Sequence, residues 1–199
     1  MKPETSNSKY PKLNYSLHEP KPDKRWLYES LYETTRRDIL IPGARVFILD
    51  DLLSQEDCKN LISTSKKYGY SSVSWEYSED YRKCERVVMM ASNLAHGLWV
   101  RIQEQLTAHE VLNIRPYGFD NSGNWAPVSV NECMRFTKYS PGDHFSPHKD
   151  GAFVLNDEIR SIFTIMIYLN DDFGGGETIF YDKLGGNFLF FNFIYHLHN

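Results

Sequence analysis

From Val128 onward the chain consists of short β-type runs separated by turn signals, and this pattern constrains the fold more than any other feature. The runs are rich in β-branched and aromatic residues and cover residues 131–139, 161–169, 178–181 and 188–193. Pro141-Gly142, Asn170-Asp171-Asp172 and the glycines 174–176 separate them. We therefore expect the second part of the chain to be built of short strands.

The preceding part of the chain predicts one strand and two helices. Residues 44–50 have the composition of a strand, and Ser54 with Asp57 can cap a helix that Gly69 ends. A second helix is expected from about residue 93 to 107, since its leucine and isoleucine side chains recur every four residues: Leu94, Leu98, Ile102 and Leu106. Helices followed by strands predict an α+β fold, with helices bracing one face of a sandwich or jelly roll.

Composition predicts a folded domain without a nucleic-acid or membrane partner. Residues 1–25 are polar and are expected to form a flexible tail, which leaves 26–199 as one domain. The formal charge of −4 favours neither nucleic acid nor anionic membrane as a partner, and no apolar run reaches the roughly 18 residues of a membrane span. Three scattered cysteines and the lack of a signal-peptide pattern predict reduced thiols and a cytoplasmic location, with a nuclear one also open.

His148 and Asp150 form the clearest candidate for a chemical site. Residues two apart on an extended segment point to the same face, so they present one imidazole nitrogen and one carboxylate oxygen to a single ion. A second histidine from elsewhere would complete the 2-His-1-carboxylate set that holds non-haem Fe(II).

The neighbours of this pair occur in a specific order. They are Tyr139-Ser-Pro-Gly142, Phe145, His148-Lys-Asp150, Arg160-Ser161, Ile167-Tyr-Leu-Asn170 and Gly175-Gly-Glu-Thr178. In this order the chain resembles the Fe(II)/2-oxoglutarate-dependent dioxygenases, and within them the prolyl 4-hydroxylase-like branch, over roughly residues 44 to 182. The resemblance implies a double-stranded β-helix, or jelly roll, braced by N-terminal helices.

The resemblance also implies roles for individual residues. His148 and Asp150 would be iron ligands, and Tyr139 and Tyr168 would approach 2-oxoglutarate. The implied reaction uses O₂ and Fe(II), converts 2-oxoglutarate to succinate and CO₂, and hydroxylates a C–H bond, with ascorbate as iron reductant. The implied substrate is a prolyl or other residue of a protein or peptide, with a small molecule as the alternative; a nucleic-acid demethylase fits the acidic chain less well.

The end of the sequence leaves the third ligand open. Counting from Gly185 favours His196, but strand parity puts His198 on the same face. The cation expected to pair with the distal carboxylate of 2-oxoglutarate, and the last strand or strands of the jelly roll, would lie beyond Asn199. We therefore expect a C-terminally truncated form of a longer enzyme. The alternative is a catalytically inactive remnant that acts as an interaction module or has no function.

Overall fold

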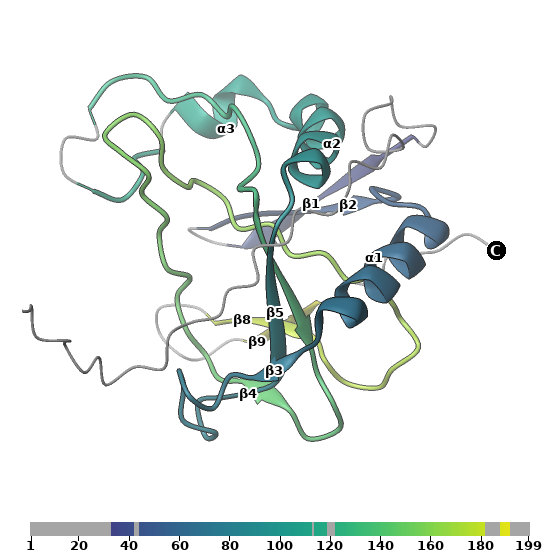
Figure 1. Cartoon of the computed structure of the whole chain (residues 1–199). Helices are drawn as coiled ribbons and strands as arrows, with labels where there is room; N and C mark the ends of the chain where they lie inside the picture. The colour runs from purple at the N-terminus through teal and green to yellow at the C-terminus, as the bar shows by residue number, and fades with distance from the viewer. Residues whose placement is uncertain (1–32, 42–43, 113, 119–121, 182–187, 192–199) are drawn as a thin grey trace, which may run out of the picture.

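The computed structural model describes residues 33–41, 44–112, 114–118 and 122–181, together with the backbone of strand 188–191 (Figure 1). The helices in this part of the chain are α1 (Gln55–Tyr68), α2 (Ser92–Ile102), a 3₁₀ turn (Gln103–Gln105) and α3 (Ala108–Leu112). The strands are β1 (Thr35–Ile41), β2 (Ala44–Asp50), β3 (Ser71–Ser72), β4 (Arg82–Lys83), β5 (Glu85–Met90), β6 (Cys133–Lys138), β7 (His144–Phe145), β8 (Thr178–Tyr181) and β9 (Phe188–Phe191).

The described strands pair in four small antiparallel sheets. Their strand orders are β1-β2, β3-β5-β6, β4-β7 and β8-β9. The expected mixture of helices and short antiparallel strands is confirmed. The jelly roll implied by the resemblance stays a prediction.

Strand β2 and helix α1 form where local sequence signals predicted them. β2 spans Ala44–Asp50 and pairs along its full length with β1, which the sequence had not indicated. In the capping box of α1, the Ser54 hydroxyl accepts from the Asp57 amide at 3.0 Å and the Asp57 carboxylate accepts from the Ser54 amide at 3.2 Å. Gly69 ends the helix with a φ of 78°, a conformation that glycine adopts without a steric penalty.

The second helix is shorter than expected. α2 ends at Ile102, a 3₁₀ turn follows, and Leu106 has extended backbone, whereas the apolar spacing predicted a helix to Thr107. Thr107 directly precedes α3 and binds its first turn: its amide donates to the Glu110 carboxylate at 2.7 Å and its carbonyl accepts from the Glu110 amide. This local capping interaction competes with continuation of α2.

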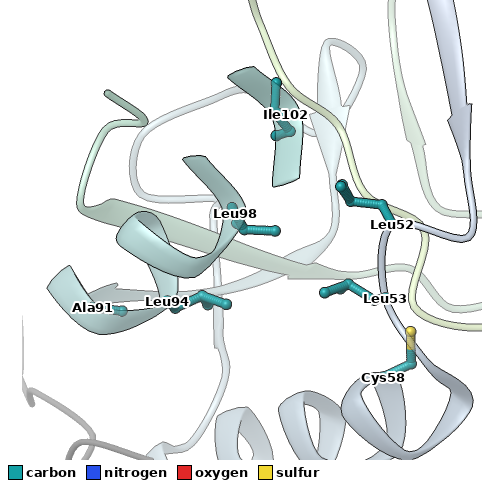
Figure 2. Close-up of a cluster of buried hydrophobic side chains, with 7 residues drawn as sticks. All are labelled: Leu52, Leu53, Cys58, Ala91, Leu94, Leu98 and Ile102. Carbon is teal, nitrogen blue, oxygen red and sulfur yellow. The ribbon is translucent and has the colours of Figure 1, made fainter. Parts of the chain in front are cut away.

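The hydrophobic core joins the region after β2 to one face of α2. Its buried residues come from the β2–α1 connection, from α1, and from α2 with the residue before it, and are Leu52, Leu53, Cys58, Ala91, Leu94, Leu98 and Ile102 (Figure 2). Leu106 packs partly buried against them. The predicted apolar stripe of the second helix is therefore a core face, as amphipathic helices usually bury such a stripe.

The segment Ser161–Leu169 is not a strand, which corrects the expectation from its β-branched composition. Within the described residues its backbone contacts are limited to its start, where the Ser161 amide donates to the Phe153 carbonyl at 2.8 Å. Ile167 and Leu169 pack against the core cluster. Burial of these two side chains therefore attaches the segment to the core.

Candidate metal centre

The short β4–β7 ladder fixes the backbone just before His148. Phe145 pairs with Arg82, and beyond the ladder the Ser146 amide donates to the Tyr81 carbonyl at 2.9 Å. The Ser146 hydroxyl donates to the Asp80 carbonyl at 3.0 Å. These contacts anchor the residues from which the candidate ligands extend.

The His148 ring is held in one orientation by two contacts. Its Nδ1 lies 2.8 Å from the Ser146 carbonyl oxygen, and its plane stacks on the Phe145 ring at a centroid distance of 3.6 Å and an angle of 19°. Because a carbonyl can only accept, a proton on Nδ1 makes this contact, which leaves Nε2 as the nitrogen that faces Asp150 and that carries the lone pair in the neutral ring. The histidine is therefore in the tautomer that can bind a metal through Nε2.

Asp150 faces this free nitrogen. Its Oδ1 lies 3.3 Å from His148 Nε2. The Asp150 side chain is 56% exposed and the His148 side chain is 27% exposed, so solvent reaches the pair. Two lone-pair atoms at this separation repel one another unless a proton or a cation lies between them. When two ligand atoms each lie about 2.1 Å from one ion and their bonds to it form a right angle, the two atoms are about 3.0 Å apart. The pair therefore fits two adjacent positions of one metal ion.

The third ligand falls outside the described part of the chain. Among the residues that the structure describes, no group of three or more His, Cys, Asp or Glu side chains is placed to hold a metal. His196 and His198, the two candidates from the sequence, both lie in 192–199 and outside the described ranges.

Arg82 connects the Phe145–His148 stack to Tyr139. Its guanidinium lies 4.0 Å from the Phe145 ring centroid and interacts with the Tyr139 hydroxyl. Partial burial raises the pKa of Tyr139, the neighbouring Cys84 thiol adds to this effect, and Arg82 opposes it. Tyr139 therefore stays protonated at neutral pH and can donate a hydrogen bond.

Aromatic rings surround the same arginine. Tyr81 meets the Phe145 ring edge-on at 5.5 Å, Tyr77 lies 5.8 Å from Tyr81, and Arg82 lies 5.4 Å from the Tyr77 ring. Tyr81 and Tyr139 remain exposed. An aromatic surface with an embedded cation thus adjoins the His148–Asp150 pair.

Tyr168, the second tyrosine singled out by the sequence, contacts the glycine-rich turn. Its hydroxyl donates to the Gly176 carbonyl at 3.0 Å and lies 2.8 Å from the Thr178 hydroxyl, while its ring stacks on Phe173. These contacts join Tyr168 to the glycine-rich turn and to the start of β8. A contact between Tyr168 and 2-oxoglutarate stays a prediction.

Two further histidines and the three cysteines were not candidates for the site. His96 is exposed on α2, and the His109 carbonyl accepts from Arg45 at 3.0 Å. The three cysteines are free thiols, as expected; Cys133 is only partly buried. Burial, with a smaller contribution from the Asp57 charge, raises the pKa of Cys58 to about 11, so that this thiol is unreactive near neutral pH.

Comparison with known proteins shows that the chain is similar to prolyl 4-hydroxylases. It is 25% identical over 147 residues to probable prolyl 4-hydroxylase 3 of Arabidopsis thaliana, an alignment that covers 72% of this chain and 47% of the relative. It is 27% identical over 139 residues to prolyl 4-hydroxylase 5 of the same plant, covering 68% of this chain and 44% of the relative. The chain thus spans under half the length of the curated relatives it matches. No protein-family model and no solved structure match it.

Proposed function

We propose that this chain is an Fe(II)- and 2-oxoglutarate-dependent dioxygenase that hydroxylates a C–H bond of a protein or peptide residue. The observation that carries the proposal is the 3.3 Å approach of His148 Nε2 to Asp150 Oδ1, with the Nδ1 proton held by the Ser146 carbonyl. Similarity to prolyl 4-hydroxylases supports the same assignment.

In this proposal His148 and Asp150 hold the iron together with His196, with His198 as the alternative third ligand. The bound iron and 2-oxoglutarate supply oxygen activation and oxidative decarboxylation, and ascorbate keeps the iron reduced. The Ser146 carbonyl fixes the His148 tautomer, and the Phe145 ring restricts rotation of the imidazole. The protonated Tyr139 hydroxyl is suited to donate a hydrogen bond to a carboxylate of 2-oxoglutarate.

The aromatic surface beside the pair favours a peptide substrate. Exposed tyrosine rings stack readily on proline rings and on extended peptide backbone, and Tyr81 and Tyr139 offer such faces beside Arg82. We propose a prolyl residue in an extended peptide as the substrate. A small molecule is the alternative substrate class, for which these rings would serve as pocket walls.

None of the described helices is both long enough and apolar enough to cross a membrane.

The test is succinate formation from 2-oxoglutarate by the purified chain with Fe(II), ascorbate and a proline-rich peptide. We expect peptide-dependent succinate that His148→Ala and Asp150→Ala each reduce at least about 100-fold, because each removes one of three ligands. His96→Ala, an exposed histidine on α2, is the matched control and should keep full activity. Equal succinate in the native chain and in His148→Ala would contradict the proposal and favour a catalytically inactive interaction module.

The third ligand is tested separately with His196→Ala and His198→Ala. Only one of the two variants should lose activity to the level of His148→Ala, since a 2-His-1-carboxylate set needs one further histidine. Full activity in both variants would exclude both residues as the third ligand.

A further inference from the structure

The candidate carboxylate ligand stands in the one Asp-Gly pair of the sequence. Asp150 is followed by Gly151, each of the other aspartates is followed by a residue with a side chain, and no asparagine precedes a glycine. Closure of a five-membered ring joins the Cγ of an aspartate to the nitrogen of the next residue. Both atoms belong to one short segment, so no second molecule has to be brought into place. Glycine leaves this nitrogen unhindered, since it has no Cβ. The pair therefore has the covalent arrangement that favours a succinimide.

The structure leaves both reacting groups accessible. The Asp150 side chain is 56% exposed, and within the described residues its contact is the 3.3 Å approach of Oδ1 to His148 Nε2. Residues 148–153 are in neither helix nor strand, and the described part of the chain shows no hydrogen bond from the Gly151 amide. A Cβ added to Gly151 would meet nothing within 4 Å. An exposed backbone with so few restraints can fluctuate into the geometry that closes the ring.

Other described aspartates are restrained. The Asp57 carboxylate accepts from the Ser54 amide in the cap of α1, and the Asp143 carboxylate accepts from the Ser140 amide at 2.8 Å. A carboxylate held by such a donor is not free to turn toward the following nitrogen. Sequence and structure therefore single out the same residue, Asp150.

The rearrangement of this pair takes two balanced steps. The Gly151 nitrogen attacks Asp150 Cγ and forms an N–Cγ bond, while one carboxylate oxygen leaves as water with the amide proton and one proton from solvent. Water then adds to either carbonyl of the ring, one C–N bond breaks, and the borrowed proton returns to solvent. Addition at Cγ restores aspartate, whereas addition at the α-carbonyl carbon gives isoaspartate. No oxidant, reductant or further reactant takes part.

Isoaspartate cannot present its carboxylate as aspartate does. Its main chain runs through Cβ and Cγ and is one carbon longer, and its free carboxylate is attached directly to Cα. The carbon that now carries the Asp150 oxygen to 3.3 Å from His148 Nε2 is then part of the backbone. Because a metal centre needs its ligand atoms in place to within a fraction of an ångström, this change separates the pair.

We propose that Asp150-Gly151 is a site of isoaspartate formation that removes the carboxylate ligand from the metal-free chain, and that metal coordination suppresses it. A carboxylate coordinated together with His148 Nε2 points toward the residue two positions earlier and away from the following amide nitrogen. The suppression by metal rests on the proposed function. The isomerisation itself depends on the Asp-Gly pair and on its exposure.

The first experiment follows isoaspartate in the metal-free full chain during prolonged incubation at physiological temperature. Peptide mapping with electron-transfer fragmentation distinguishes isoaspartate from aspartate although the two have equal mass. Isoaspartate should accumulate at Asp150 and not at Asp143, whose carboxylate is held by the Ser140 amide. Absence of isoaspartate at Asp150 would overturn the proposal. This comparison is made within the native chain and needs no variant.

Gly151→Ala is the matched variant. Gly151 is not among the glycines with positive φ, and an added Cβ meets nothing within 4 Å, so alanine fits the fold. The methyl group should slow isoaspartate formation about 10-fold, because it hinders the nitrogen that attacks Cγ. Equal rates of conversion in the native chain and in Gly151→Ala would overturn the proposed route through the succinimide.

The second experiment repeats the incubation with Fe(II) under anaerobic conditions. At a free Fe(II) concentration about 100-fold above the dissociation constant, about 1% of the chain is metal-free, so conversion should slow about 100-fold. Equal conversion with and without Fe(II), in a chain that binds Fe(II), would overturn the suppression by metal. A chain that forms isoaspartate at Asp150 but binds no Fe(II) would defeat the proposed function and confirm the modification site.

The third experiment measures Fe(II) binding by the incubated chain. The fraction of native chain that binds Fe(II) should fall in step with its isoaspartate content, whereas Gly151→Ala should keep its binding. Treatment with S-adenosylmethionine and a methyltransferase that esterifies isoaspartyl carboxylates should restore part of the binding. The ester closes again to the succinimide with loss of methanol, and part of the ring opens to aspartate. Native Fe(II) affinity in a fully converted chain would overturn the loss of the carboxylate ligand.

Discussion

The contact between His148 Nδ1 and the Ser146 carbonyl determines which ring nitrogen the candidate metal centre can use. Ser146 is itself fixed by two hydrogen bonds, from its amide to the Tyr81 carbonyl and from its hydroxyl to the Asp80 carbonyl. Nε2 is therefore available beside Asp150 before any ion arrives. Preorganisation of this kind keeps a ligand in the correct tautomer and is a common source of metal affinity.

The stack of Phe145 on His148 should contribute to this preorganisation. Phe145→Leu keeps an apolar side chain but removes the flat face against the imidazole and the cation–π contact with Arg82. We expect an approximately 10-fold weaker Fe(II) affinity, measured by anaerobic titration, since loss of groups that orient a ligand has this scale of effect. Phe153→Leu changes an exposed phenylalanine outside the stack and should bind Fe(II) with the native affinity. An unchanged Fe(II) affinity in Phe145→Leu would show that the stack does not contribute to metal binding.

At this scale the sequence indicated the pair His148 and Asp150 but not the residues that support it; their role as metal ligands stays a prediction. His148 and Asp150 stand two positions apart, so extended geometry brings them together without any tertiary information. Arg82 reaches Phe145 only through a ladder of two residue pairs between β4 and β7, and Asp80 accepts from Ser146 across 66 residues. A ladder of only two residue pairs, formed by segments far apart in the chain, produces no hydrophobic periodicity in the sequence from which it could be predicted.

Among the secondary-structure elements, α1 depends on its capping box. Ser54→Ala removes the hydroxyl that accepts from the Asp57 amide and should lower the free energy of unfolding by about 1 kcal/mol, measured by urea denaturation. Ser63→Ala, an exposed serine in the middle of the same helix, is the matched control and should change stability by less than about 0.5 kcal/mol. Equal stability of Ser54→Ala and the native chain would contradict the contribution of the cap.

β1 and α3 are joined by an ion pair that predicts a pH dependence. Glu110 accepts from Arg36, and this hydrogen bond lowers the pKa of Glu110 to about 2; partial burial opposes the shift and Thr107 donors add to it. A depressed pKa means that the carboxylate stabilises the fold fully above its unfolded pKa of about 4.3, and that this stability is lost as pH falls toward 2.

The measurement is the difference in unfolding free energy between the native chain and Glu110→Gln across pH. The difference should be constant from pH 7 to about 5 and should shrink steadily as pH falls from about 4.3 toward 2. Glu104→Gln, an exposed glutamate in the neighbouring 3₁₀ turn, should show no such profile. A Glu110→Gln difference that is independent of pH would mean that the ion pair does not stabilise the fold.

The predicted elements that formed are those with local signals. α1 has a cap, an apolar face and a terminal glycine within 16 residues, and β2 is a continuous β-type run. Ser161–Leu169 has the same composition as a strand, but a strand also needs a neighbour to pair with, and composition does not report one. β1 was missed because its run of three consecutive charged residues, Arg36-Arg37-Asp38, resembles a solvated loop until the pairing with β2 is known.

At the scale of the whole molecule, the core and the candidate centre involve different elements. The core cluster joins the start of α1 to α2 (Figure 2), whereas His148 and Asp150 follow the short β4–β7 ladder and are not members of that cluster. Substitution of either ligand should therefore leave the thermal midpoint close to the native value while it removes metal binding. The mixture of helices and short strands and the adjacency of His148 and Asp150 were predictable from sequence, and the third ligand stays a prediction.

Equilibrium Fe(II) binding under anaerobic conditions tests the central claim most directly. The purified chain should bind one Fe(II) per molecule, and both His148→Ala and Asp150→Ala should lower the affinity at least about 100-fold while His96→Ala leaves it unchanged. Circular dichroism of each variant establishes that it is folded. One Fe(II) bound with equal affinity by the native chain and by a folded His148→Ala variant would contradict the assignment of His148 and Asp150 as iron ligands.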